Sequence, residues 1–139
     1  IPEAWGKKDD LLIRILAVEK ERMKTLSEFS NLAGFFFSLP EYPVKLLIWQ
    51  TVIPKVILEN LRSVLEILEK IEEKDFQKKN LEPSLMLLAE MRGRGELLWP
   101  LRVALSGKNA SPGPLDILEI LGKEESVKRV KLAIKKLQN

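Results

Sequence analysis

The chain has 139 residues, enough for one compact domain or for two small ones that share a core. It contains no histidine and no cysteine, which excludes disulfides, thiolate or imidazole metal sites and nucleophiles activated by histidine. The net charge of +3 is unevenly spread, because residues 1–91 carry 13 Lys and Arg against 15 Asp and Glu, whereas residues 92–139 carry 10 against 5. The resulting +5 of the last third indicates a polyanionic partner for that part.

The sequence also argues against a membrane protein and against catalysis by this chain. No apolar run approaches the ~20 residues that a membrane-spanning helix needs. The chain begins Ile1-Pro2-Glu3, without an initiator Met or a signal-peptide pattern, so we expect a segment of a longer, cytoplasmic protein. A glycine-rich phosphate loop, a dinucleotide fingerprint and a metal-ligand cluster are all missing from the sequence.

Glycine and proline separate a series of helical patterns without sustained strand alternation, which predicts an all-α fold. The first helix is expected to start at Asp9 or Asp10, either of which can cap it, and to end near Ser27. Residues 31–40 contain three consecutive Phe between Gly34 and Pro40, and predict a short apolar turn inserted into the core. The next predicted helices span residues 44–51, 54–71 and 81–91.

The long middle helix has the clearest pattern. Pro54 suits the first position of a helix, where its missing N–H is not needed. Apolar residues then alternate steps of four and three, which predicts a buried stripe at Ile57, Leu61, Val64, Leu68 and Ile71.

Gly93 and Gly95 are predicted to break the chain, which gives two small helical subdomains, residues 1–92 and residues 93–139. The second would contain a helix over 99–106 with Pro100 in its first turn and Gly107 as its C-terminal cap. A loop over 108–114 follows. A helix is then expected over 115–121, ended by Gly122. The last helix is expected over 124–137, with an apolar stripe on one side and many basic residues on the remainder; the stripe consists of Val127, Val130, Ile134 and Leu137.

Three runs carry a resemblance to a known family. They are GELLWPLRVALSG at residues 95–107, SPG at residues 111–113 and ILEILGKE at residues 117–124. In this order and spacing they resemble the C-terminal end of bacterial-type glutamyl-tRNA synthetases, where a "PLRVALTG" helix, a Ser/Thr-Pro loop and an "ILxxLGKE" helix follow one another. The resemblance continues upstream through Glu21–Leu26 and Phe35–Phe37, and so covers essentially the whole chain. Pro114 departs from the bulky apolar residue often found at its position.

The resemblance implies a helical cage that holds the anticodon loop of glutamate tRNA. The complete enzyme would be a class I synthetase that activates glutamate with ATP and Mg²⁺ and transfers it to tRNA. That chemistry would lie in an N-terminal Rossmann domain of the same polypeptide, since the HIGH-type and KMSKS-type motifs do not occur in this sequence. The resemblance thus implies a monomeric, non-catalytic part of the enzyme that needs no cofactor of its own.

The candidate RNA contacts fall into three groups. Arg102 lies one position beyond an apolar stripe formed by Leu97, Leu98, Leu101 and Leu105, and would reach across to the loop at residues 111–114. There its guanidinium could stack on a base and donate two parallel hydrogen bonds. Ser111, Pro112 and Gly113 would let a base approach the backbone closely. The resemblance links Arg22 with the third anticodon base. The cations that would neutralise loop phosphates are Lys128, Arg129, Lys131 and Lys135.

Each candidate also has a structural interpretation. Arg102 would bond loop carbonyls, residues 111–113 would form a plain turn, and Arg22 would pair with Glu19 or Glu21. Trp49 and Trp99 are expected to pack in the core rather than stack on bases. A protein-interaction module remains the alternative function, because residues 1–91 are slightly acidic and the long helix carries an apolar stripe.

Overall fold

The computed structural model describes residues 34–35 and 38–139. The predicted first helix, with Arg22, and two of the three consecutive Phe lie outside the described residues. Within the described part no strand occurs, in agreement with the predicted all-α class. From residue 38 onward the described part contains four α-helices and two short 3₁₀ helices, in the order η1 (Val44–Leu47), α4 (Pro54–Lys70), η2 (Glu73–Asp75), α5 (Lys78–Arg92), α6 (Arg94–Ser106) and α7 (Pro114–Gln138).

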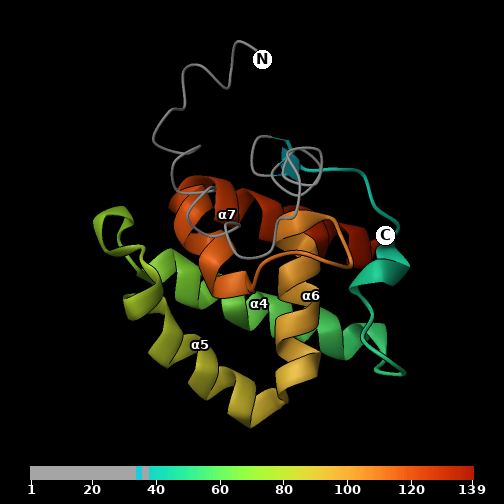
Figure 1. Cartoon of the computed structure of the whole chain (residues 1–139). Coiled ribbons are helices and arrows are strands. Elements are labelled where there is room, and N and C mark those ends of the chain that lie inside the picture. The colour runs from blue at the N-terminus through green and yellow to red at the C-terminus, as the bar shows by residue number, and fades with distance from the viewer. Residues whose placement is uncertain (1–33, 36–37) are drawn as a thin grey trace.

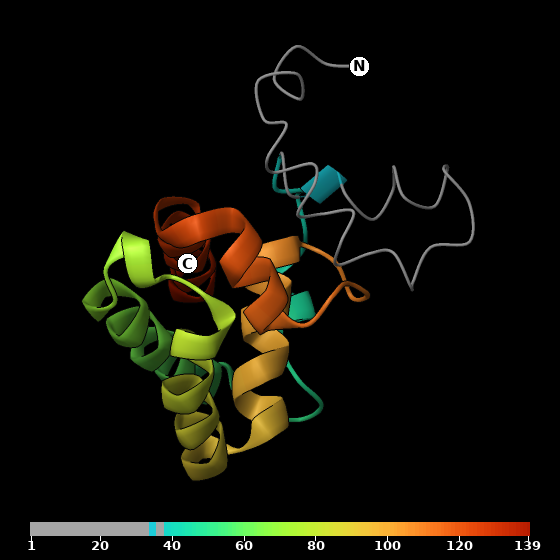
Figure 2. The ribbon, with the colours of Figure 1, turned by 60° about the vertical axis from the view of Figure 1, so that its left-hand side comes forward.

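Helices α4 and α7 lie side by side, and α6 runs across both, while α5 leads back from the end of α4 to the start of α6 (Figures 1 and 2). One hydrophobic core joins the four helices. The predicted stripe of α4 supplies its centre, since Ile57, Leu61, Val64 and Leu68 are fully buried. Phe35 is also buried, as expected for the apolar run over 31–40, but it and Gly34 are helical and not part of a turn. This core lies on both sides of the predicted boundary at residues 92 and 93, and the boundary itself stays a prediction.

Several predicted ends are confirmed. Pro54 occupies the start of α4. Gly107 adopts the left-handed conformation, with φ of 69°, and caps α6. Within α7, Gly122 has φ of 81° and ψ of 172°, so the helical geometry is interrupted there as predicted. Such backbone angles are essentially restricted to glycine.

The predicted helix over 44–51 is wrong in its length, since only the 3₁₀ turn η1 forms. Continuation as an α-helix would require the Leu46 carbonyl to accept the N–H of Gln50. Instead, Leu46 accepts a hydrogen bond from the indole Nε1 of Trp99, at 2.9 Å. The predicted core role of Trp99 is thereby borne out, because its ring packs against the core and its polar edge is satisfied by the backbone.

The predicted starts of two later helices are also wrong. Helix α6 begins at Arg94, not near Trp99, so Pro100 lies in its interior. Proline at this position removes the bond to the carbonyl four residues earlier, that of Glu96. The side chain of Asn60 on α4, only 1% exposed, supplies the missing donor through Nδ2 at 3.0 Å. Helix α5 likewise starts three residues earlier than predicted and tolerates Pro83 inside it.

Gly95 does not break the chain, because it belongs to the first turn of α6. It is needed for a different reason. The ring of Trp49 lies against its Cα, and any Cβ at this position would overlap the indole. Only Gly93, with φ of 101°, separates α5 from α6.

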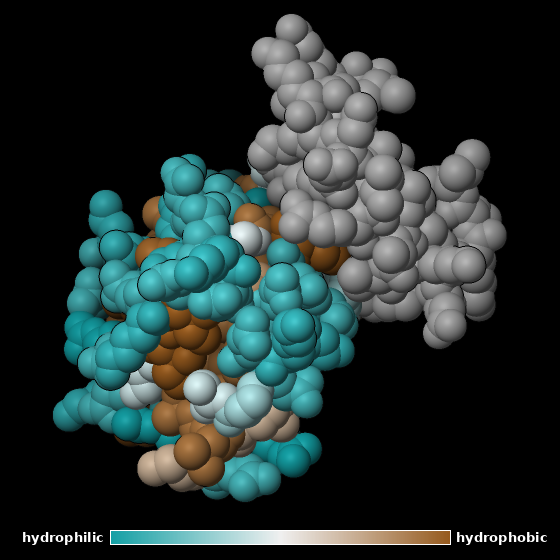
Figure 3. Space-filling view, turned by 90° about the vertical axis from the view of Figure 1, so that its left-hand side faces the viewer, coloured by the Kyte–Doolittle hydropathy of each residue, from teal (hydrophilic) through white to brown (hydrophobic). Residues whose placement is uncertain are grey.

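The outer side of α5 carries exposed apolar side chains. Leu87 is 61% exposed and Met91 is 74% exposed. Figure 3 shows hydrophobic surface from the centre of this face to its lower end, with hydrophilic side chains around it.

Candidate nucleic-acid interface

The loop between α6 and α7 is built on the capped end of α6. The N–H of Gly107 bonds the Val103 carbonyl at 2.7 Å and closes the helix. A Cβ on Gly107 would lie 2.9 Å from the carbonyl oxygen of Pro40, so glycine also permits close packing of the two segments. The Ser106 hydroxyl lies 2.8 Å from the Arg102 carbonyl and accepts the N–H of Lys108 at 3.1 Å. These bonds fix the direction in which the loop leaves α6.

Arg102 reaches the loop at Asn109, before the residues 111–114 that it was expected to reach, and bonds a loop carbonyl as its structural interpretation predicts. Its Nη2 donates to the carbonyl of Asn109 at 3.0 Å. The guanidinium also lies 5.0 Å from the ring centroid of Trp99, within the range of a cation–π contact. The planar group is therefore held in place before any ligand arrives, and it is only partly buried.

The three loop residues predicted to meet a base differ in exposure. Ser111 is only 4% exposed, and its hydroxyl donates to the carbonyl of Pro112 at 3.0 Å. Pro112 is buried, whereas Gly113 is exposed. A Cβ on Gly113 would meet only Asp116 Oδ2, at 3.8 Å, which is ordinary van der Waals contact. The structure thus brings Arg102 to this loop and leaves the backbone at Gly113 open.

The predicted phosphate-binding cations do not all face solvent. Lys128, Lys131 and Lys135 are at least partly exposed and follow one another by three and four residues, so they share a face of α7. The Lys131 ammonium lies 4.0 Å from a Glu69 carboxylate oxygen, a contact worth little at this exposure. The basic face predicted for the last helix is therefore present, with three of its four candidate residues.

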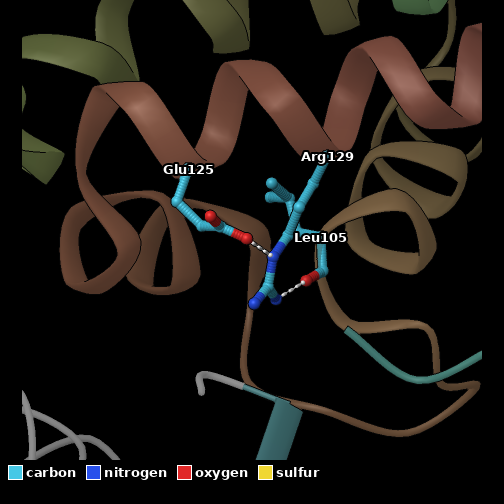
Figure 4. Close-up of polar contacts among 3 residues, drawn as sticks. All are labelled: Leu105, Glu125 and Arg129. Carbon is cyan, nitrogen blue, oxygen red and sulfur yellow. Dashed lines mark hydrogen bonds and ion pairs between the residues drawn. The ribbon is translucent and has the colours of Figure 1, made fainter. Parts of the chain in front are cut away.

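The expectation that Arg129 is exposed is wrong. Its side chain is 1% exposed. Figure 4 shows the guanidinium between α7 and the end of α6, where Nε donates to Glu125 Oε2 and Nη1 donates to the carbonyl of Leu105, each at 2.7 Å. Sequence periodicity places Arg129 beside Val130, at the margin of the apolar stripe, and the structure turns this margin inward.

Lys136, which was not among the predicted RNA contacts, contacts Tyr42. Lys136 bonds the carbonyl of Tyr42 at 3.1 Å and lies 4.7 Å from the centroid of the Tyr42 ring. It therefore ties the end of α7 to the segment that precedes η1. The sequence signals neither contact, because 94 residues separate the two partners.

The buried Tyr42 hydroxyl makes stability depend on alkaline pH. Burial, with a further contribution from the charge of Glu41, raises the pKa of Tyr42 from 10.0 to about 12. The folded state thus favours the neutral phenol. The stabilisation is full below pH 10 and is lost as pH rises from 10 to 12, by roughly 2 kcal/mol.

We expect a Tyr42→Phe variant to lack this pH dependence. Unfolding free energies measured by urea titration at pH 8 and pH 11.5 should fall by roughly 2 kcal/mol more in the original chain than in the variant. At pH 8 the variant should be at least as stable, because the buried hydroxyl has no hydrogen-bond partner among residues 34–35 and 38–139. Equal losses in the two chains would contradict the assignment to Tyr42.

The described residues contain neither a membrane-spanning helix nor a cluster of metal ligands. No helix among them is long and apolar enough to cross a membrane. No group of three or more Asp or Glu side chains in residues 34–35 and 38–139 is placed to hold a metal ion.

Comparison with known proteins gives a consistent result. The family model described as "anticodon binding domain" matches residues 2–134. A glutamate–tRNA ligase of Clostridium tetani is 39% identical over 137 residues, which is 95% of this chain and 28% of that protein. The glutamate–tRNA ligase of Clostridium kluyveri is 40% identical over 131 residues, 91% of this chain and 26% of that protein. The chain therefore spans about a quarter of the length of these relatives.

Solved structures agree. A glutamate–tRNA ligase of Elizabethkingia meningosepticum superposes with a TM-score of 0.76 at 28% identity, covering 94% of this chain and 26% of that one. A glutamate–tRNA synthetase of Elizabethkingia anophelis gives a TM-score of 0.68 at 27% identity, covering 92% and 24%. With the family match over residues 2–134, these findings show that the chain belongs to the anticodon-binding-domain family.

Proposed function

We propose that this chain recognises the anticodon loop of glutamate tRNA as part of a glutamyl-tRNA synthetase. The family match over residues 2–134 carries the proposal. The relatives named glutamate–tRNA ligase support the amino acid, and hence the tRNA. Activation of glutamate with ATP and Mg²⁺ would belong to the rest of the same polypeptide, a monomer acting in the cytoplasm. A protein-interaction module is not favoured by these relatives.

The geometry supports separate groups of residues for bases and for phosphates. Arg102, together with the open backbone at Gly113, would read an unstacked base by stacking and by hydrogen bonds to its edge. The exposed lysines of α7 would neutralise phosphates of the loop without reading sequence. Ser111 would act through the shape of the turn, since its hydroxyl is committed to the backbone. Arg22, outside the described residues, is proposed to read the third anticodon base.

Titration of the 139-residue chain with glutamate tRNA, glutamine tRNA and an unrelated tRNA, at two salt concentrations, tests the proposal. We expect the tightest binding for glutamate tRNA, weakening steeply with salt. In single Lys→Met variants at the three α7 lysines, each removed ion pair with a phosphate should reduce the slope of log K against log salt by about 0.7. The preference between tRNAs should survive these substitutions.

The same titration separates the parts of the proposal. Equal, salt-sensitive binding of all three tRNAs would leave a phosphate-binding domain and contradict base reading. Absence of binding at low salt and high protein concentration would contradict tRNA recognition by this chain. Addition of a tRNA with a changed anticodon but an unchanged body identifies the anticodon as the feature that is read.

A further inference from the structure

The interior of the interface contains a buried charge that binding does not use directly. Arg129 is among the largest fully buried side chains of the described residues, at 1% exposure. Arginine stays protonated, and burial of an unpaired charge costs several kcal/mol. Glu125 and the Leu105 carbonyl compensate for this, with bonds of 2.7 Å each. Replacement of a buried ion pair by hydrophobic residues is often neutral or stabilising in proteins, so packing alone does not account for an arginine at this position.

The hydrogen bond to the Leu105 carbonyl shows which part of the fold the Arg129 guanidinium fixes. Leu105 belongs to the last turn of α6, which ends at Ser106. The last four carbonyls of a helix lack partners within it, and this end carries the negative pole of the helix dipole. The Arg129 guanidinium satisfies one of these carbonyls and places a positive charge at that pole. It therefore fastens the end of α6 to the second half of α7.

That end of α6 begins the loop proposed to read bases. Arg102 holds the same loop at Asn109, so the loop has one anchor before it and one within it. Lys128 and Lys131 lie on either side of Arg129 along α7 and are at least partly exposed. One side chain thus fixes the base-reading loop relative to the lysines proposed to bind phosphate.

We propose that Arg129 is a positioning residue for anticodon discrimination: without touching RNA, it sets the placement of residues 107–113 relative to the basic face of α7. The inference rests on the proposed function of this chain. It separates affinity from specificity. Removal of the Arg129 side chain should relax the choice between anticodons, whereas removal of an exposed neighbour should weaken binding of every RNA alike.

Three variants of the full chain test this. Arg129→Met keeps apolar volume and removes both hydrogen bonds, Glu125→Gln perturbs only the Nε pair, and Lys128→Met is the matched control on the basic face. Each is titrated with glutamate tRNA and with the same tRNA bearing a changed anticodon, below the melting temperature of every variant. In Arg129→Met, the ratio of the two dissociation constants should fall roughly 5- to 10-fold, with the salt slope unchanged. Lys128→Met should keep the ratio and lower the slope.

Hydrogen–deuterium exchange gives a second readout, since the amides of residues 107–113 should exchange faster in Arg129→Met. A folded Arg129→Met chain that keeps the original ratio overturns the inference and leaves the proposed function standing. Should Arg129→Met not fold, Glu125→Gln decides, with an expected decrease of about threefold in the ratio. Glu125 is 39% exposed and its replacement leaves a neutral acceptor, so we expect this variant to fold. An unchanged ratio in Glu125→Gln also overturns the inference. If the original chain shows no preference between the two RNAs, the proposed function fails first and the inference with it.

Discussion

A Gly95→Ala variant should be less stable than the original chain by about 1–3 kcal/mol, the usual cost of overpacking a close contact. A Cβ at this position would overlap three ring atoms of Trp49. The indole is a rigid bicycle that packs partly buried on α6, so it must move as a whole. The expected sign is opposite to that of an ordinary exposed helix position, where replacing glycine by alanine gains up to about 1 kcal/mol.

Chemical denaturation of five chains measures this effect and its cause: the original, Gly95→Ala, Gly113→Ala, Trp49→Ala and the double variant of Trp49→Ala with Gly95→Ala. Gly113→Ala is the matched control, because its φ of −61° suits alanine and, among the described residues, the atom nearest to its Cβ lies 3.8 Å away. This control should stay within about 0.5 kcal/mol of the original. In the double variant Trp49→Ala with Gly95→Ala, the clash is gone, so the second substitution should become neutral or stabilising. A destabilising Gly95→Ala in the absence of the Trp49 ring would refute the steric explanation.

The sequence predicted those features of the helices that depend only on residues close to one another in the chain. The stripe of α4, the start at Pro54, the cap at Gly107 and the break at Gly122 all depend on nearby residues. The errors came from contacts between distant residues. Pro100 predicted a helix start, because proline suits the first turn of a helix. The helix instead continues through it, since Asn60, 36 positions away in sequence, donates to the Glu96 carbonyl that Pro100 leaves without a partner.

The candidate site divides in the same way. Charge counts predicted the basic last helix, and Arg102 was placed near the loop because it follows an apolar stripe. Periodicity could not show that Arg129 turns inward, because its two partners are a carboxylate on its own helix and a backbone carbonyl on another. A backbone carbonyl cannot be recognised as a hydrogen-bond acceptor from the sequence. Whether a long basic side chain at the edge of an apolar stripe points inward or outward is therefore known only from the fold.

The second large effect concerns Arg102. Arg102→Ala should reduce the preference for the glutamate anticodon by about 1–3 kcal/mol, the cost typical of removing a bidentate contact to a base. Arg102→Lys should recover little of it, because an ammonium lacks the planar fork that stacks on a base and donates two parallel bonds. Competition titrations with glutamate tRNA and its anticodon variant measure the preference directly.

Arg102 also supports the fold through Asn109 and Trp99, so weaker binding after its substitution has two possible causes. Gly113→Ala resolves them. The structure predicts that this variant folds unchanged, yet a methyl group there would occupy the space through which a base approaches the backbone. Weakened glutamate tRNA binding in both Arg102→Ala and Gly113→Ala, with Gly113→Ala as stable as the original chain, locates the base beside this loop. Full binding by Gly113→Ala would place the base elsewhere and leave Arg102 with its structural role.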